Sequence, residues 1–328
     1  MPPSVSSVDV SVVIPTHNRV GYLEHAIESC FDGNDSVDVE VVVVNDGSSD
    51  GTREYLDQLS DPRVRAIHQE AQGAQVARNR GKEKADGEYL KFLDDDDWLA
   101  SGGLEAEVKC LERSDADVAY GRLQIRRESD GSAWIVPEAS GEDAAAMIFR
   151  ESVRTAPHKY LFRRKAIQDC SWDPSLPYHQ DYAFLVDVAC SGFEFAGVED
   201  IVGGIRLHDG PRIADTKTAA ARADYYTLKV NLIIRGVRRL QEKGLLTNER
   251  RRAAAEGIWN WAHIVAGFDL RTFNQFYDEI ERLVPQFTPE RSRQVFAVLD
   301  SIFGVRGAEQ VVYPYRRVKN ILQKPHSS

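Results

Sequence analysis

Cysteine is scarce in this 328-residue chain, and its few cysteines are far apart. No CxxC pair occurs among them; the four are Cys30, Cys110, Cys170 and Cys190. A structural zinc site needs closely spaced ligands, and a disulfide framework needs many cysteines in a short chain. Neither is expected here, and this cysteine content is typical of a protein in a reducing cytoplasm.

Long apolar runs and an excess of positive charge are also missing. No run approaches the ~20 apolar residues that cross a bilayer, and the N-terminus shows no signal-peptide pattern. The formal net charge is −10, whereas a general nucleic-acid binder is expected to have a basic surface. We therefore expect a soluble cytoplasmic protein that does not bind nucleic acid, with one large domain or two smaller ones.

Glycine-rich phosphate-binding loops are absent as well. The chain contains neither GxGxxG nor GxxxxGK[ST], the two patterns in which a backbone loop cradles a diphosphate. A diphosphate ligand would therefore need a bound cation to offset its charge. The sequence also shows no Ser/His/Asp or Cys/His arrangement of the kind used in covalent catalysis.

The first hundred residues alternate between apolar strand-like runs and helical periodicity. Strands are predicted at 8–15, 39–46, 63–69 and 89–93, with helices at 23–30, after a cap at Ser49 or Asp50, and at 74–85. The second run, VEVVVVND, is nearly continuously apolar, as in a parallel strand covered on both faces. Four alternations predict an α/β sandwich with a mainly parallel sheet.

The chain is predicted to become helical from about residue 214. Three helical segments are predicted at 224–244, 248–268 and 288–304, the last starting at Thr288 before Pro289. We therefore divide the chain into an α/β domain, residues 1–213, and a helical region, residues 214–328. The final segment, YPYRRVKNILQKPHSS, combines basic and apolar residues. It is interpreted either as a solvated tail or helix-end packing, or as a segment that docks on an anionic membrane surface.

Polar side chains follow three of the predicted strands, at the points where the strands end. The clusters are Thr16, His17 and Asn18 after the first strand, Asn45, Asp46 and Gly47 after the second, and Asp94–Asp97 after the fourth. Each cluster alone is ordinary turn chemistry. Ligands of open α/β sheets bind beyond the carboxyl ends of the strands, so three clusters on one edge predict a binding site.

The stretch YLKFLDDDDWL, residues 89–99, is either an exposed acidic turn or a cation site, because adjacent carboxylates repel one another. In an extended segment, Asp94 and Asp96 would point to one side, and Asp95 and Asp97 to the other. Carboxylate oxygens are the ligands that Mg²⁺ and Mn²⁺ prefer, and a metal held by one or two of them keeps positions open for substrate phosphates. We therefore predict a divalent metal, Mn²⁺ or Mg²⁺, at this run.

Four motifs, in this order, resemble those of the family 2 glycosyltransferases. They are VSVVIPTHNR (10–19), EVVVVNDGSSDGT (40–52), ARNRGKEKADGEYLKFLDDDDWL (77–99) and HQDY (179–182). The resemblance covers roughly residues 8 to 210. It implies a GT-A fold, with a Rossmann-like sheet sandwiched by helices, and an inverting, metal-dependent enzyme that uses nucleotide-diphosphate sugars, here a UDP-sugar.

The resemblance also implies roles for individual residues. The donor-binding set is Pro15, Thr16, Asn18, Asp46, Arg78, Asp94 and Asp95. Within it, Thr16 lies at the mouth of the nucleotide pocket, Asp46 reads the base and Asp95 lies near the ribose; Asn79 lines the donor side with Arg78. Asp96 is the metal-binding aspartate of a DxD motif that begins at Asp94, and His208 completes the metal site. Asp181 is the catalytic base.

The chain departs from the family pattern at three positions, and several alternatives stay open. Asn45 and Gln180 stand where acids are usual, and Asp187 stands where an arginine is common. Asp181 is also a simple helix N-cap in sequence terms, and His208 an ordinary loop histidine. The remaining candidates have less specific interpretations: His158 and His179 as acceptor contacts, Trp98 as a packing anchor, and Trp259 and Trp261 as core or interface residues.

The resemblance implies two partners and leaves others open. The donor is a nucleotide sugar, and the acceptor is a carbohydrate, a lipid-linked sugar or a small molecule. The helical region is expected to shape the acceptor side or a homo-oligomer interface, and the protein to lie in the cytoplasm with peripheral contact to the inner face of the membrane. The alternatives from other classes are a non-catalytic nucleotide- or carbohydrate-binding relative and an aspartate-based phosphohydrolase.

Overall fold

The structure is a computed structural model that describes residues 8–136, 143–152, 154–208, 219–290 and 294–322. The chain divides into two compact units. The first comprises residues 1–141, 154–188 and 193–210, and the second comprises 142–153, 189–192 and 211–328. The domain boundary predicted between 213 and 214 lies outside the described residues. Among the residues that the structure describes, no helix combines the length and apolar character of a membrane span.

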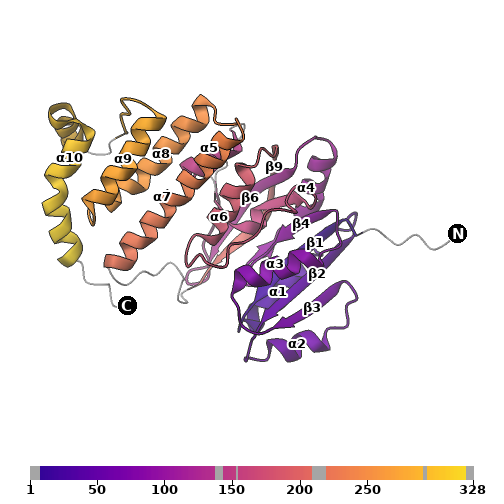
Figure 1. The fold of residues 1–328 in the computed structure, drawn as a ribbon. Helices are drawn as coiled ribbons and strands as arrows, with labels where there is room; N and C mark the ends of the chain where they lie inside the picture. The colour runs from indigo at the N-terminus through magenta and orange to yellow at the C-terminus, as the bar shows by residue number, and fades with distance from the viewer. Residues whose placement is uncertain (1–7, 137–142, 153, 209–218, 291–293, 323–328) are drawn as a thin grey trace. The chain divides into compact units, whose positions relative to one another are not determined.

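The first unit contains a mixed sheet, and its described strands number nine. They are β1 (Val10–Thr16), β2 (Val39–Asp46), β3 (Val64–Gln69), β4 (Tyr89–Phe92), β5 (Trp98–Leu99), β6 (Val118–Arg127), β7 (Ala133–Ile135), β8 (Tyr160–Arg163) and β9 (Phe195–Leu207). The order is β3-β2-β1-β4-β8-β6-β9-β5, with β7 paired to β6. The four predicted strands are confirmed as the parallel half, β3-β2-β1-β4 (Figure 1). The sheet as a whole is mixed, because β8 runs antiparallel to both of its neighbours.

Helices cover both faces of this sheet. In chain order they are α1 (Val20–Ser29), α2 (Thr52–Gln58), α3 (Ala74–Lys84), α4 (Gly103–Glu112) and α6 (Gln180–Ala189), with a 3-10 turn, η1 (Pro157–Lys159), before β8. One face carries an apolar core in which Leu23 of α1 and Leu104 of α4 pack on the valines of β1 and β2. On the other face α3 lies close to β1, since a Cβ added at Gly81 would come within 2.3 Å of Val13. The predicted α/β sandwich is therefore confirmed.

The second unit is helical. Its helices are α5 (Ala144–Arg150), α7 (Ala219–Glu242), α8 (Asn248–Val265), α9 (Leu270–Leu283) and α10 (Gln294–Leu322). Side-chain oxygens of Thr247 and Asp269 cap the starts of α8 and α9. Trp259, predicted as core or interface, is buried in the core. The helix α9 was not predicted. The predicted start at Thr288 is wrong, because Thr288 to Glu290 are not helical and α10 begins at Gln294.

Candidate functional site

The carboxyl ends of three neighbouring parallel strands bring the polar clusters together, as predicted. β1 lies between β2 and β4, and Thr16 at the end of β1 is in register with Asn45 of β2. The acidic run begins two residues beyond Phe92, the last residue of β4. Because the strands are parallel, all three clusters lie on the same edge of the sheet.

The loops after β1 and β2 are linked by hydrogen bonds. His17 Nδ1 lies 2.6 Å from the Asp46 carbonyl oxygen. The Asn18 side-chain oxygen accepts a bond from the Ser49 N–H at 2.7 Å, and the backbone of Asn18 is in the left-handed region, with φ of 55°. An asparagine tolerates this conformation better than most residues do. Asn18 therefore fixes the shape of the edge as well as lying on it.

Asp46 organises a third loop. Its carboxylate accepts hydrogen bonds from the backbone N–H groups of Gln72 (2.8 Å) and Gly73 (2.7 Å) and from Gln69 Nε2 (2.7 Å). The side chain is buried. The position is thus rigid, and the loop that leads into α3 is held against the end of β2.

The acidic run is a turn, and the alternation of faces expected for an extended segment is wrong. Asp95 and Asp96 form the turn, and the Asp97 N–H donates to the Asp94 carbonyl oxygen at 3.1 Å. The reason is the topology: β4 ends at Phe92, and the chain must reverse within a few residues to enter β5, which pairs with β9. Asp95 and Asp97 are buried, so the run is not an exposed acidic turn either.

Basic side chains from distant parts of the sequence offset three of the four charges. Asp94 pairs with Arg78 of α3. Arg19 Nη1 pairs with Asp95, at 3.2 Å, and with Asp96. His208, which follows β9, places Nε2 3.2 Å from the same Asp96 oxygen, Oδ2. The Asp96 carboxylate thus pairs with the Arg19 guanidinium and lies beside the His208 imidazole.

Asp97 ties the turn to β9. Its Oδ1 accepts a hydrogen bond from the Arg206 backbone N–H at 2.9 Å, and the Arg206 Nε donates to the Asp96 carbonyl oxygen at 3.1 Å. Arg206 lies two residues before His208. Asp97 was predicted as part of the acidic run, but its partner Arg206 and the pairing of Arg19 were not, because no local pattern connects positions so far apart in the sequence.

Burial shapes the protonation of these acids. Burial raises the pKa of the Asp95 carboxyl to about 6, against the opposing effect of Thr16 and Arg19. Burial, with the charges of Asp94 and Asp96, also holds the pKa of Asp97 well above its ordinary value. Burial opposes ionisation of Asp94 too, but the adjacent Arg78 guanidinium outweighs it, and the pKa of Asp94 is lowered. Of these three acids, Asp94 therefore keeps its charge most firmly.

His158 does not face an acceptor, contrary to the sequence interpretation. It is completely buried, and its Nδ1 lies 3.5 Å from Asp97 Oδ2. Burial lowers the pKa of His158 to about 4, so the imidazole is neutral at physiological pH. Its role is internal, beneath the acidic turn. Asn79 is likewise engaged in the fold, because its side-chain amide makes two hydrogen bonds to the backbone of Trp172, at 2.8 and 2.9 Å.

Arg78 connects the turn to Asp181. Its guanidinium is buried over the ring of Trp172, 4.4 Å from the centroid, and its Nη2 lies 3.9 Å from Asp181 Oδ1 as well as on Asp94. Asp181 itself is 38% exposed. It lies in the first turn of α6, which begins at Gln180, so it is not the N-cap residue that the sequence alternative proposed. An acid in the first helical turn is favoured by the helix dipole in its ionised form.

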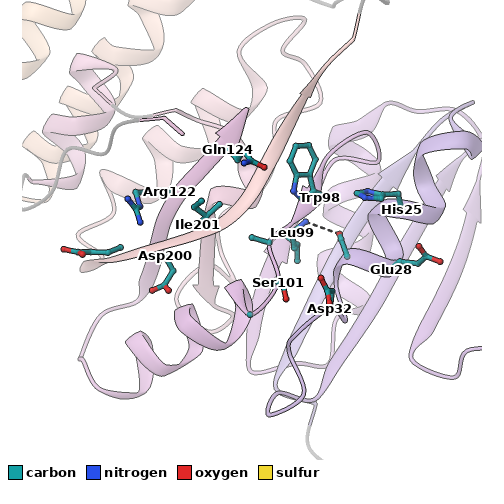
Figure 2. A pocket seen from close by; sticks show the side chains of 14 residues that line it. His25, Glu28, Asp32, Trp98, Leu99, Ser101, Arg122, Gln124, Asp200 and Ile201 are labelled. Carbon is teal, nitrogen blue, oxygen red and sulfur yellow. Dashed lines mark hydrogen bonds between the residues drawn. The ribbon is translucent and has the colours of Figure 1, made fainter. Parts of the chain in front are cut away.

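A separate pocket of about 1000 Å³ lies elsewhere in the first unit (Figure 2). Trp98 stands at its wall, with its ring packed on Gly204, where an added Cβ would come within 2.0 Å. Trp98 is therefore the packing anchor that was predicted. Four carboxylates line the pocket, at Glu28, Asp32, Glu199 and Asp200, against one arginine, Arg122. This charge disfavours a diphosphate, and none of the predicted site residues lines the pocket.

The described residues contain no group of three or more His, Cys, Asp or Glu side chains that could hold a metal ion. Asp96 and His208 form a pair at most. This pattern does not fit a closed structural metal site, which needs about four protein ligands. It fits an open site in which a substrate supplies the remaining ligands.

Comparisons with known proteins relate the chain to one family. The model of the family described as glycosyl transferase family 2 matches residues 11–171. A putative teichuronic acid biosynthesis glycosyltransferase, TuaG of Bacillus subtilis, is 39% identical over 226 residues, which are 67% of this chain and 87% of that protein. Glycosyltransferases GlyA and GlyG of Streptococcus pneumoniae are 35% and 34% identical over 124 and 141 residues, or 37% and 41% of this chain. The chain spans only 18% and 44% of their lengths.

Among solved structures, S. aureus TarS 1–349 in complex with UDP-GlcNAc matches with a TM-score of 0.65 and 14% identity, covering 97% of this chain and 93% of that one. At this identity the match supports the fold alone. The sequence similarity to TuaG over most of its length supports the family. The chain therefore belongs to the family 2 glycosyltransferases and has their GT-A fold.

Proposed function

We propose that the protein is an inverting glycosyltransferase that moves a sugar from a nucleoside-diphosphate donor to an acceptor hydroxyl. The observation that carries the proposal is the shared guanidinium of Arg78, which pairs with Asp94 and lies 3.9 Å from Asp181. One buried cation thus links the turn assigned to the donor with the carboxylate assigned to the acceptor. An enzyme that aligns a leaving group and a nucleophile across one sugar needs both groups fixed relative to each other.

The donor lies at the edge formed by the ends of β1, β2 and β4. Thr16 and Asp46 lie there with buried side chains, and Pro15 and Asn18 fix the backbone beside them. TarS has been solved with UDP-GlcNAc and with UDP, which supports a UDP-sugar as the donor. Asp46 is the residue that we assign to base recognition and Asp95 the residue that we assign to the ribose.

Asp96 and His208 are the residues that would hold a divalent metal, Mn²⁺ or Mg²⁺. The pair fits an ion that keeps positions for diphosphate oxygens. Such an ion, when bound, acts as a Lewis acid that stabilises the negative charge of the leaving diphosphate. Arg19 pairs with the same Asp96 oxygen, which shows that this oxygen accepts positive charge. Asp97 and Arg206 hold the turn and β9 together, so they position Asp96 relative to His208.

Asp181 is assigned as the general base. Its partly exposed carboxylate accepts the proton of the acceptor hydroxyl as that hydroxyl attacks the sugar. Arg78 fixes its position, and the start of α6 favours the ionised form. A single displacement of this kind inverts the anomeric centre and needs no nucleophilic side chain. The second unit is assigned to the acceptor side or to a homo-oligomer interface.

A phosphohydrolase is not favoured by the geometry. In such an enzyme the first aspartate of the motif is the nucleophile, and this would be Asp94. The carboxylate of Asp94 is instead engaged by the buried guanidinium of Arg78. A carboxylate held in this ion pair is poorly placed to attack a phosphate.

The test is calorimetric titration of the full chain with UDP in Mn²⁺, in Mg²⁺ and in EDTA, followed by turnover of a panel of nucleotide sugars. Binding is expected to be markedly tighter with either metal. Release of UDP from a UDP-sugar supports the transferase. Release of inorganic phosphate from simple monoesters would instead support the hydrolase. UDP affinity that ignores the metal would contradict the assignment of Asp96 and His208.

A further inference from the structure

Exposed apolar side chains concentrate on one helix of the second unit. Among the described residues, the large apolar side chains that are exposed are Trp134, Ile135, Val298, Ile302, Phe303, Val311 and Tyr315. The last five all belong to α10. Several are more than half exposed, as with Ile302 at 63% and Tyr315 at 73%. Scattered apolar residues are normal on a surface, but a concentration of this kind marks an interaction site.

These side chains form a face on each half of α10. The helix is interrupted at Gly304, which has a non-helical backbone with φ of 70° and ψ of 165°. Before the interruption, Val298 and Ile302 are four residues apart, and after it Val311 and Tyr315 are four residues apart. Residues at this spacing lie on one side of a helix. Figure 1 shows α10 as two helical pieces beside α9, at one end of the helical unit.

The part of α10 that follows Gly304 is packed within the unit at its start. Ala308 and Glu309 are completely buried. Arg306 pairs with Asp278 of α9, and its guanidinium lies 4.9 Å from the centroid of the Tyr277 ring. Residues 306–309 thus anchor this part of the helix to the unit, while Val311 and Tyr315 beyond them stay exposed.

The end of the chain, from residue 310 on, has a net charge opposite in sign to that of the rest of the chain. From residue 310 to the end, the sequence has no acidic residue and four basic ones, Arg316, Arg317, Lys319 and Lys324. The whole chain has a formal charge of −10. A basic segment therefore follows directly on Val311 and Tyr315 at the end of the apolar face, whereas residues 298–309 carry Asp300, Arg306 and Glu309.

We propose that the exposed apolar side chains of α10, Val298, Ile302 and Phe303 before Gly304 and Val311 and Tyr315 after it, dock on the surface of an anionic lipid bilayer. An exposed apolar helix face next to basic residues is the pattern of a helix that lies in the membrane interface. Basic residues near an anionic leaflet add binding energy that salt weakens. A second copy of the chain is the competing occupant, and the test below distinguishes it from a bilayer.

The test is flotation of the full chain with lipid vesicles. Vesicles of phosphatidylcholine alone and of phosphatidylcholine mixed with phosphatidylglycerol are compared at low and high salt. Binding is expected with the anionic vesicles at low salt, and it should decrease by about tenfold or more when salt is raised or when Arg316→Glu and Arg317→Glu are combined. Activity is not measured, so the result does not depend on the proposed reaction.

A matched pair of variants separates this face from general hydrophobicity. Ile302→Ser with Phe303→Ser is expected to weaken vesicle binding by about tenfold or more. Trp134→Ser with Ile135→Ser removes the other adjacent pair of exposed apolar side chains, on β7, and should leave binding unchanged. Circular dichroism and melting temperature show whether both variants keep the fold, as expected for changes at exposed positions.

Three results would overturn the proposal. The first is absence of binding to anionic vesicles at low salt. The second is equal loss of binding in both variant pairs. The third is a concentration-dependent dimer, seen by sedimentation, that the Ile302 and Phe303 changes abolish while vesicle binding persists, because this would assign the face to a second copy of the chain.

Discussion

Lys91 on β4 and Asp96 in the turn that follows lie close together in the sequence, but their charges are paired in different surroundings. Lys91 and Glu107 form an ion pair in which both side chains are completely buried. Asp96, five positions after Lys91, pairs with Arg19, whose side chain is 39% exposed. The first pair is closed to water and to any ligand. The second is open on the side of the guanidinium.

This difference in exposure distinguishes a charge pair that serves the fold from one that a ligand can reach. A buried pair gains little net stability, since the loss of hydration offsets its attraction, but breaking it leaves an uncompensated charge. A half-exposed arginine on a carboxylate gains little too, and another cation can take its place at small cost. The same residue types, a few positions apart, therefore imply opposite responses to mutation.

The largest expected effect is on stability and belongs to the buried pair. Lys91→Met leaves Glu107 buried without its partner and should destabilise the protein by about 3–5 kcal/mol in urea unfolding. Lys109→Met is the matched control, since Lys109 pairs with Glu105 at an exposed i,i+4 position and its loss should cost about 0.5 kcal/mol. The double variant Lys91→Met with Glu107→Leu should recover most of the loss. If both lysine changes lowered the free energy of unfolding by the same amount, the proposed difference between buried and exposed charge pairs would be wrong.

The next largest effect is on catalysis. Asp181→Asn keeps the size of the side chain but cannot accept a proton, so transfer should fall by roughly 10²-fold or more. UDP affinity and melting temperature should stay near those of the unchanged protein. Asp187→Asn on the same helix is the control and should retain transfer. Near-normal turnover of Asp181→Asn on its true acceptor would remove Asp181 from the mechanism.

A smaller effect is expected in metal binding. Asp96→Asn should weaken Mn²⁺ affinity by about 10-fold or more. Loss of a residue that only supports a metal ligand already has an effect of this size. UDP should then bind equally well with and without EDTA. Arg19→Gln should act in the opposite direction, because it removes the cation that pairs with Asp96. Titration of Mn²⁺ at saturating UDP measures both. If the two variants shift the affinity in the same direction, Arg19 does not occupy a cation position.

The parallel half of the sheet was predictable because its signal is local. Strands such as β1 and β2 are buried along nearly their whole length, and a continuous apolar run is visible in a short window of sequence. The other half has weaker signals: β7 is exposed throughout, and β9 is buried at only a few positions. These segments are strands because they pair with β6, and β9 also with β5.

The position of the site was predictable from the sequence, but the ion pairs and hydrogen bonds within it were not. Strand ends on one edge follow from topology, so Thr16, Asp46 and the acidic run could be placed together. The partners of the acids could not be predicted, because Arg19 pairs with Asp95 over 76 positions and Arg206 with Asp97 over 109. The turn geometry was also missed, because it depends on where β5 pairs with β9.

The smallest expected effect belongs to a buried group that carries no charge. His158 ordinarily has a pKa of 6.5, and burial lowers it to about 4 in the folded protein. Between these values the unfolded chain binds a proton that the folded protein excludes, so the contribution of His158 to stability is complete above pH 6.5 and is lost as the pH falls toward 4. Replacement by Gln removes this dependence.

The destabilisation caused by His158→Gln should therefore be larger at about pH 7.5 than at about pH 6, by about 1 kcal/mol in urea unfolding. The groups facing the imidazole are Asp97, Asp94, Lys91 and Lys159. Asp97 has the opposite linkage, since burial raises its pKa, so Asp97→Asn should show a pH trend of opposite sign. A destabilisation by His158→Gln that is the same at both pH values would mean that the folded protein does not exclude the proton. His158 would then belong with the open charges beside Arg19 rather than with the buried ones.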